Sequence, residues 1–195
     1  MAGTVSDETR AQILDAAWQL MASEGRLDVG MAEVARAAGV SRQSVFNAVG
    51  SRAGLLLEMV RYRDTRSEHV ATLGRIAGTP SPDAATLHAY VDAWLDYLPE
   101  VYPVAIQLEV ASLTDADADA AWRDRIVGRG VRRGLDGICA RLEASGSLRG
   151  GSAKEAADLC LSWVLPSTWR HLVVSCNWTP EAFRASRHAL IDTLV

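Results

Sequence analysis

The chain has 195 residues, of which 49% are hydrophobic and 23% charged, and its formal net charge is −4. This length and composition support a compact core and two packed units, while the net negative charge argues against a protein that coats nucleic acid without sequence preference. No apolar run reaches the ~20 residues that a bilayer-spanning helix needs, so we expect no membrane partner.

The first ten residues, MAGTVSDETR, contain no apolar segment, so we expect no signal peptide and a cytoplasmic protein. The cysteines agree with this compartment, because Cys139, Cys160 and Cys176 are odd in number, widely spaced and set in apolar contexts. That usage is typical of reduced core residues. A redox-sensing thiol would need an exposed position beside a partner, which the sequence does not indicate.

The first predicted helix covers Ser6–Glu24. Ser6 or Asp7 would cap its N-terminus, and Gly25 would end it. Apolar side chains recur along it at intervals of three and four residues, which places them on one helix face. These apolar positions are Ile13, Leu14, Ala17, Trp18 and Met21.

The segment Met31–Val49, MAEVARAAGVSRQSVFNAV, predicts two short helices joined by a tight turn, the unit that places a helix in the DNA major groove. Gly39 falls where the turn needs a positive φ, which glycine adopts at the lowest cost. Ser41 would cap the second helix. Apolar residues at helical spacing would form the seam between the two helices, namely Val34, Ala38, Val45 and Val49.

The second helix of this hairpin presents side chains that suit a DNA groove. Arginine and glutamine read base edges, while hydroxyls and amides hold phosphates. Residues 41–66 contain five arginines and two acidic residues, whereas residues 1–40 contain three arginines and six acidic residues, so the positive charge lies on this helix and the next. The alternatives are an ordinary helical hairpin and a normal solvated helix face. The outward residues are Arg42, Gln43, Ser44, Phe46 and Asn47.

A fourth helix follows, which Ser51 would cap and Arg52 would open. With this order of elements, the stretch Arg10–Val60 resembles the TetR family of bacterial transcriptional regulators. That resemblance implies an all-α fold, with a helix-turn-helix DNA-binding domain over residues 1–52 and a helical ligand-binding and dimerisation domain over residues 53–195. The residues that carry it are Ile13, Ala16, Ala17, Gly25, Val34, Ala35, Ala38, Gly39, Val40, Ser41, Ser51, Arg52, Leu55 and Leu56.

Several positions depart from the family pattern. Val29 and Gly30 stand where a Thr or Ser begins the second helix, and Phe46 replaces a tyrosine and lacks its hydroxyl. Ala48–Val49 replaces a His-Phe pair, and Arg52 replaces a lysine. Because phosphate contacts supply much of the affinity for DNA, we expect weaker or differently distributed binding. The expected DNA-binding residues are Gly30, Ser41, Arg42, Gln43, Ser44, Phe46, Asn47 and Arg52.

Gly78–Pro82 is the clearest break after the hairpin, and it is expected to end the fourth helix. No strand pattern follows it. Helices are predicted for Asp83–Leu98 and Val104–Leu113, with Pro99 and Pro103 bracketing a bend between them.

A long helix is predicted for Ala116–Ala144, in which four glycines within ten positions indicate a local break or very close packing. Ser152 and Glu155 form a capping box for a helix to about Ser175, which Pro166 should kink. Thr179 followed by Pro180 would begin the last helix. The four glycines are Gly128, Gly130, Gly134 and Gly137.

The two C-terminal helices are apolar on more than one face. A helix that packs only within its own domain needs one apolar stripe, so a second stripe indicates a homodimer with a two-fold helical interface. A dimer would also supply a second recognition helix ~34 Å away for a palindromic operator. The alternative is a monomer that buries both stripes. The expected interface residues are Cys160, Val164, His171, Leu172, Phe183, Arg187, Leu190 and Ile191.

Aromatic residues are concentrated in the second predicted domain, as in pockets that hold a small apolar or aromatic effector ligand. For any single aromatic residue, core packing is the commoner role. No cofactor or metal is expected, because the four histidines are scattered without cysteines at metal-ligand spacing. The expected ligand-binding residues are Tyr62, Tyr90, Trp94, Tyr97, Gln107, Trp122, Trp163 and Trp169.

The sequence lacks G-x-S-x-G, a Gly-rich phosphate loop ending in Lys-Ser/Thr, and H-E-x-x-H, so no enzyme is expected. It predicts a homodimeric transcriptional regulator, a ligand-responsive repressor on a palindromic double-stranded DNA operator. A ligand that binds two states unequally would shift their populations and release the operator. Two alternatives stay open: a ligand-binding helical dimer with a weakened or lost DNA-reading head, and a small helical enzyme.

Overall fold

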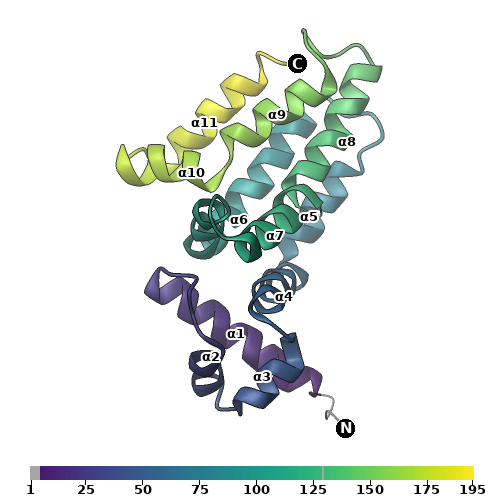
Figure 1. The fold of residues 1–195 in the computed structure, drawn as a ribbon. Helices are drawn as coiled ribbons and strands as arrows, with labels where there is room; N and C mark the ends of the chain where they lie inside the picture. Colours follow the sequence, from purple (N-terminus) through teal and green to yellow (C-terminus); the bar gives the residue numbers. More distant parts are fainter. Residues whose placement is uncertain (1–4, 129) are drawn as a thin grey trace. The chain divides into compact units, whose positions relative to one another are not determined.

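The computed structural model describes residues 5–128 and 130–195, and all regular elements among them are helices, which confirms the all-α expectation (Figure 1). These residues pack as two compact units. Unit 1 runs to Arg66 and also includes Val101–Arg125, and unit 2 comprises Ser67–Glu100 and Ile126–Val195. The predicted division between residues 52 and 53 concerns function and stays a prediction. The first four residues of the segment analysed for a signal peptide lie outside the described ranges.

Unit 1 begins with the three predicted helices. Helix α1 covers Asp7–Glu24, α2 covers Met31–Ala37 and α3 covers Arg42–Val49. The side chain of Ser6 accepts a hydrogen bond from the Thr9 amide, as the predicted cap requires. Gly39 has φ 64° in the turn between α2 and α3, which confirms the reason for a glycine there. These local predictions are correct because caps and turns depend on neighbouring residues.

The predicted fourth helix is two helices. Helix α4 covers Arg52–Thr65, with Ser51 as its cap, and α5 covers Glu68–Ala77. The side chain of Ser67 accepts a hydrogen bond from the His69 amide 3.2 Å away, so a new N-cap begins α5 before the predicted break. The expectation of a single helix reaching Gly78 was therefore wrong.

The two helices expected on either side of Pro99 and Pro103 form one helix in the described chain, where α6 runs without interruption over Ala84–Ala111. Each proline removes one helical hydrogen bond. Burial of apolar residues on both sides offsets that loss, because Leu98 and Val101 are fully buried while Pro99 is exposed.

The predicted helix over Ala116–Ala144 is interrupted. Helix α7 covers Ala116–Arg123, a π-helical turn covers Asp124–Gly128, and α8 covers Val131–Ala144. The glycines also permit close packing, since a Cβ on Gly134 would lie 2.0 Å from the Tyr90 hydroxyl oxygen. Both explanations offered for the glycine cluster therefore hold, at different positions.

The C-terminal part of unit 2 contains α9 (Ala153–Trp163), α10 (Pro166–Trp169), a π-helical segment (Arg170–Ser175) and α11 (Pro180–Ile191). The predicted Ser152 capping box and Thr179 cap are both present. At Pro166 the helix breaks instead of kinking, because Leu165 takes an extended conformation with ψ 149°. A residue before proline disfavours the helical region.

Two of the three cysteines are core residues, as expected. Cys139 and Cys160 are fully buried, and a hydrogen bond between their thiols, together with burial, raises the pKa of Cys160. Cys176 is exposed after the π-helical segment, so its prediction as a core residue was wrong. Although Cys176 has apolar neighbours in the sequence, residues 174–182 are all exposed to solvent. No described helix is long and apolar enough to cross a membrane.

Candidate nucleic-acid interface

Helix α3 buries one face and exposes the other. Val45 and Ala48 are buried at 0% and 7% exposure, and they attach α3 to the rest of unit 1. The opposite face is open to solvent, and the Phe46 side chain is 57% exposed on it. We call this exposed face of α3 the reading face. Its residues are Arg42, Gln43, Phe46 and Asn47, and Ser41 precedes them as an exposed cap.

Hydrogen bonds fix the ends and the middle of the reading face. The Ser41 hydroxyl accepts a bond from the Ser44 amide at 3.0 Å, so Ser41 works as a cap and Ser44 is half-buried beside it. The Gln43 side-chain amide donates to the Asn47 carbonyl oxygen at 2.8 Å. The two amides therefore form one polar strip, with donors and acceptors left over for base edges.

The end of α3 is held against α4 by close backbone contact and by Arg10. A Cβ on Gly54 would lie 2.0 Å from the Val49 carbonyl oxygen, so only glycine allows this approach. Arg10 donates to the Ala48 carbonyl oxygen and forms an ion pair with Glu58 at 2.9 Å. These contacts give α3 a fixed support, which a surface that reads DNA geometry requires.

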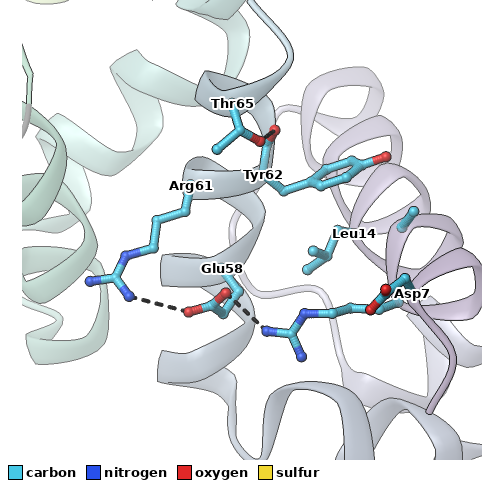
Figure 2. A pocket seen from close by; sticks show the side chains of 8 residues that line it. Asp7, Leu14, Glu58, Arg61, Tyr62 and Thr65 are labelled. Carbon is cyan, nitrogen blue, oxygen red and sulfur yellow. Dashed lines mark hydrogen bonds and ion pairs between the residues drawn. The ribbon is translucent and has the colours of Figure 1, made fainter.

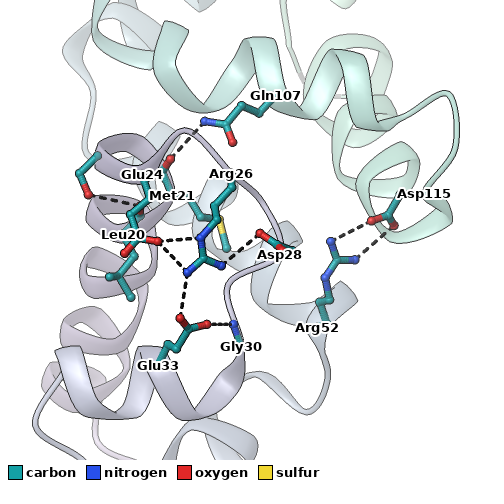
Figure 3. A network of polar contacts seen from close by, with 11 residues as sticks. Leu20, Met21, Glu24, Arg26, Asp28, Gly30, Glu33, Arg52, Gln107 and Asp115 are labelled. Atoms are coloured by element: carbon teal, nitrogen blue, oxygen red, sulfur yellow. Dashed lines mark hydrogen bonds and ion pairs between the residues drawn. The ribbon is translucent and has the colours of Figure 1, made fainter.

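The start of α2 is an acidic network instead of a phosphate clamp (Figure 3). The Gly30 amide donates to the Glu33 carboxylate at 2.7 Å, and this bond, followed by the one from Arg26, lowers the pKa of Glu33. Arg26 also pairs with Glu24 at 2.6 Å and Asp28 at 3.1 Å. Three carboxylates around one guanidinium leave this end negative, so Gly30 is present at the predicted place in an environment that repels phosphate.

Arg52, the predicted phosphate contact at the start of α4, is engaged by α7 (Figure 3). Its guanidinium lies 2.8 Å from the Asp115 carboxylate and 3.3 Å from that of Asp117. The Asp115 bond raises the pKa of Arg52 and lowers the pKa of Asp115. Binding of Arg52 to phosphate would therefore compete with these two carboxylates.

One predicted ligand residue, Tyr62, lines a cavity of about 300 Å³ between α1 and α4 (Figure 2). The polar walls of this cavity are already paired, since Glu58 bridges Arg10 and Arg61 at 2.9 Å and 3.3 Å. The Tyr62 hydroxyl donates to Asp15 at 3.3 Å. The cavity is small and charged, unlike the apolar effector pocket that the sequence predicts.

The other predicted ligand residues fall in different places. Gln107 lies in unit 1 and donates to the Met21 carbonyl oxygen at 3.1 Å. Trp94 and Tyr90 donate to the backbone oxygens of Val164 and Val131, each at 3.0 Å, inside unit 2. Tyr90, Trp94, Tyr97 and Trp169 are buried in unit 2, whereas Trp122 and Trp163 are half-buried.

Most predicted dimer residues are covered within the chain itself. Cys160, Val164, Phe183 and Ile191 are buried. Arg187 is buried over the Phe183 ring, donates to the Trp163 carbonyl oxygen at 2.8 Å, and has its pKa lowered by desolvation. Leu172 and Leu190 are half-buried and His171 is exposed. Three exposed apolar residues of unit 2 escaped the sequence prediction, namely Leu159, Val174 and Trp178.

The sequence analysis also missed the ion-pair partners of Arg26 and Arg52, which lie around α2 and at the start of α4. Arg26 and Glu33 are seven residues apart, and the spacing from Gly30 to Glu33 is that of a capping box, so this part was detectable. The pair Arg52 and Asp115 is separated by 63 residues and joins two helices. No local pattern indicates such a pair.

The N-terminal part of the chain is similar to known proteins. Residues 13–59 match the sequence model described as "Bacterial regulatory proteins, tetR family". The HTH-type transcriptional regulator BetI of Agrobacterium fabrum is 38% identical over 81 residues, which make up 40% of this chain and 39% of that relative. The aligned part therefore spans less than half the length of either protein.

Solved structures resemble the whole chain in fold. The fatty acid degradation regulator FadR of Bacillus halodurans aligns with a TM-score of 0.73 at 18% identity, covering 95% of each chain. FadR of Bacillus subtilis, solved in complex with stearoyl-CoA, aligns with a TM-score of 0.72 at 17% identity over 92% of this chain and 96% of that one. NalD of Pseudomonas aeruginosa, the secondary repressor of a multidrug efflux pump, aligns with a TM-score of 0.65 at 18% identity over 97% and 96%. At these identities the likeness concerns the fold alone.

Proposed function

We propose that this chain is a member of the tetR family of bacterial regulatory proteins, whose sequence model matches residues 13–59, and that it is a ligand-responsive repressor that binds a palindromic operator as a homodimer. The observation that supports this most is the reading face of α3. It combines a free cation at Arg42, the linked amides of Gln43 and Asn47, and an exposed cap at Ser41 on a helix whose other face is buried. Such a face fits the major groove.

The charge around the reading face restricts where phosphates can bind. The start of α2 is acidic and Arg52 is held by two carboxylates. Affinity must therefore depend more on α3 than the family pattern implies, because fewer cations are available to release counterions from DNA. We infer base-edge contacts from Arg42, Gln43 and Asn47, with Ser41 and Ser44 on the flanking phosphate.

Unit 2 is the proposed site of the effector and of dimerisation. Support for an effector comes from the fold, which is shared with FadR of Bacillus subtilis in complex with stearoyl-CoA. In this chain Tyr90, Trp94 and Tyr97 form a buried aromatic core in unit 2, and side chains of this kind line sites for apolar ligands. The exposed residues Leu159, Val174 and Trp178 add to the surface that a second copy would cover.

A second candidate function is a ligand-binding helical dimer whose DNA-reading head is weakened or lost. The acidic network at Gly30 and the sequestered Arg52 favour it. Selection of duplexes from a random pool by the purified protein, at two salt concentrations, distinguishes the two candidates. A palindrome whose affinity falls steeply with salt would support the regulator, and no enrichment at either concentration would support the weakened head.

A further inference from the structure

We propose that Phe46 is a specificity-determining residue that covers the C5-methyl group of thymine in the operator. The inference rests on the proposed DNA-binding function. It adds which chemical group of the operator Phe46 contacts. It starts from an exposed aromatic side chain on the reading face. At 57% exposure, Phe46 takes little part in the packing of unit 1, which Val45 and Ala48 provide from the same helix.

The chemistry of the ring limits what Phe46 can contact. It has no donor or acceptor, so it cannot hold a phosphate or pair with a base edge. The main gain in free energy open to an exposed phenyl ring at DNA is the removal of apolar surface from water. In the major groove the apolar group of a base pair is the thymine methyl, and phenylalanine is one of the side chains that contact it.

The residues beside Phe46 also favour a base pair that contains thymine. Gln43 lies about one helical turn before Phe46, and Asn47 directly follows it. The Gln43 side-chain amide donates to the Asn47 side-chain oxygen at 2.8 Å. Side-chain amides of this kind pair with the N6 and N7 atoms of adenine. The thymine opposite that adenine presents its methyl group in the same groove, so an A·T pair can satisfy the amide strip and the ring together.

The expected gain in affinity can be calculated from the burial of one thymine methyl group. Burying a methyl-sized apolar group contributes about 0.8 kcal/mol, which corresponds to about fourfold in affinity. Replacing thymine by uracil removes that methyl and leaves the hydrogen-bonding edge unchanged. A uracil scan of the selected operator therefore measures the proposed contact at single-base resolution.

The test compares full-length wild-type protein with Phe46→Ala, Phe46→Tyr and Asn47→Ala on operator duplexes in which each thymine is replaced by uracil in turn. For the wild type we expect a loss of about fourfold at one or two thymines of a half-site and none elsewhere. Phe46→Ala should bind more weakly and show no loss on substitution by uracil. Phe46→Tyr keeps the ring and should keep the methyl dependence, as should Asn47→Ala, which removes only an amide.

Three results would overturn the proposal. The first is an operator bound by the wild type with equal affinity for every uracil substitution, or one without thymine in its half-site, which would leave the DNA-binding function intact. The second is a methyl dependence that Phe46→Ala retains while circular dichroism shows it folded. The third is a failure of the wild type to select any sequence, which would overturn the DNA-binding function together with this inference.

Discussion

At the residue scale, several positions are determined by what fits beside them. Because Gly54 has no side chain, the end of α3 can lie close to the start of α4. Gly134 in the same way lets the Tyr90 ring pack against α8. In both places a side chain would meet an atom 2.0 Å away. Glycine is required there by space and not by backbone conformation, since neither has a positive φ.

The packing at Gly134 leads to a stability prediction. Gly134→Ala should lower the free energy of unfolding by about 1–3 kcal/mol, because the added methyl would force the buried Tyr90 ring to move. Urea denaturation followed by circular dichroism measures the change. Gly137→Ala is the matched control in the same helix, where the new Cβ would lie 3.6 Å from the Arg141 guanidinium. It should stabilise the protein by up to ~1 kcal/mol, and equal effects of the two changes would contradict the packing described.

At the element scale, α7 is joined to α4 by the Arg52 ion pairs. This contact predicts a pH dependence, because Arg52 lowers the pKa of Asp115 below its ordinary value of 3.8. The unfolded chain then binds the proton more tightly, so the stabilisation is complete above pH ~4 and is lost as the pH falls through the lowered pKa. Arg52→Met should raise the pKa of Asp115, as measured by NMR titration of its carboxyl group, and should reduce the loss of stability in acid. An unchanged pKa of Asp115 would show that the ion pair is not formed in solution.

The same contact predicts an effect on DNA binding. Asp115→Asn should weaken the hold on Arg52, leaving only the ion pair with Asp117 at 3.3 Å to compete with phosphate. It should keep the α7 cap, since asparagine caps helices as well as aspartate does. Affinity for the selected operator should rise, and the slope of log affinity against log salt should steepen by about 0.9 for each new phosphate contact.

The control for this change is Asp119→Asn, which removes the same charge from α7 where Asp119 pairs with Arg123 at 2.7 Å. If both variants bind alike, the gain reflects net charge alone and Arg52 has no separate role.

At the scale of the whole molecule, the sequence predicted what depends on neighbouring residues. The Ser41, Ser152 and Thr179 caps are all where the pattern placed them. The errors arose where tertiary packing decides. Pro99 does not interrupt α6 because the buried stripe continues past it, and Cys176 is exposed because its segment turns outward after the π-helical stretch.

The candidate site divides in the same way. The exposed reading face followed from helical periodicity, because the period of 3.6 residues assigns Val45 inward and Phe46 outward. The competition for Arg52 could not be predicted, since Asp115 lies 63 residues away in sequence. Periodicity therefore identifies which face of α3 is exposed, while the ion pairs around that face can be found only in the folded chain.

The central claim is that α3 reads a DNA sequence, and the most direct measurement is the operator affinity of the double variant Arg42→Ala, Gln43→Ala. Each good base contact contributes about 1–3 kcal/mol, so affinity should fall by at least tenfold and discrimination against random DNA should be reduced. The control is Arg75→Ala, Gln19→Ala, which removes the same two residue types from exposed positions on α5 and α1. Affinity that falls only in the α3 variant is the result we expect, and unchanged affinity in that variant would contradict the assignment of α3 as the recognition helix.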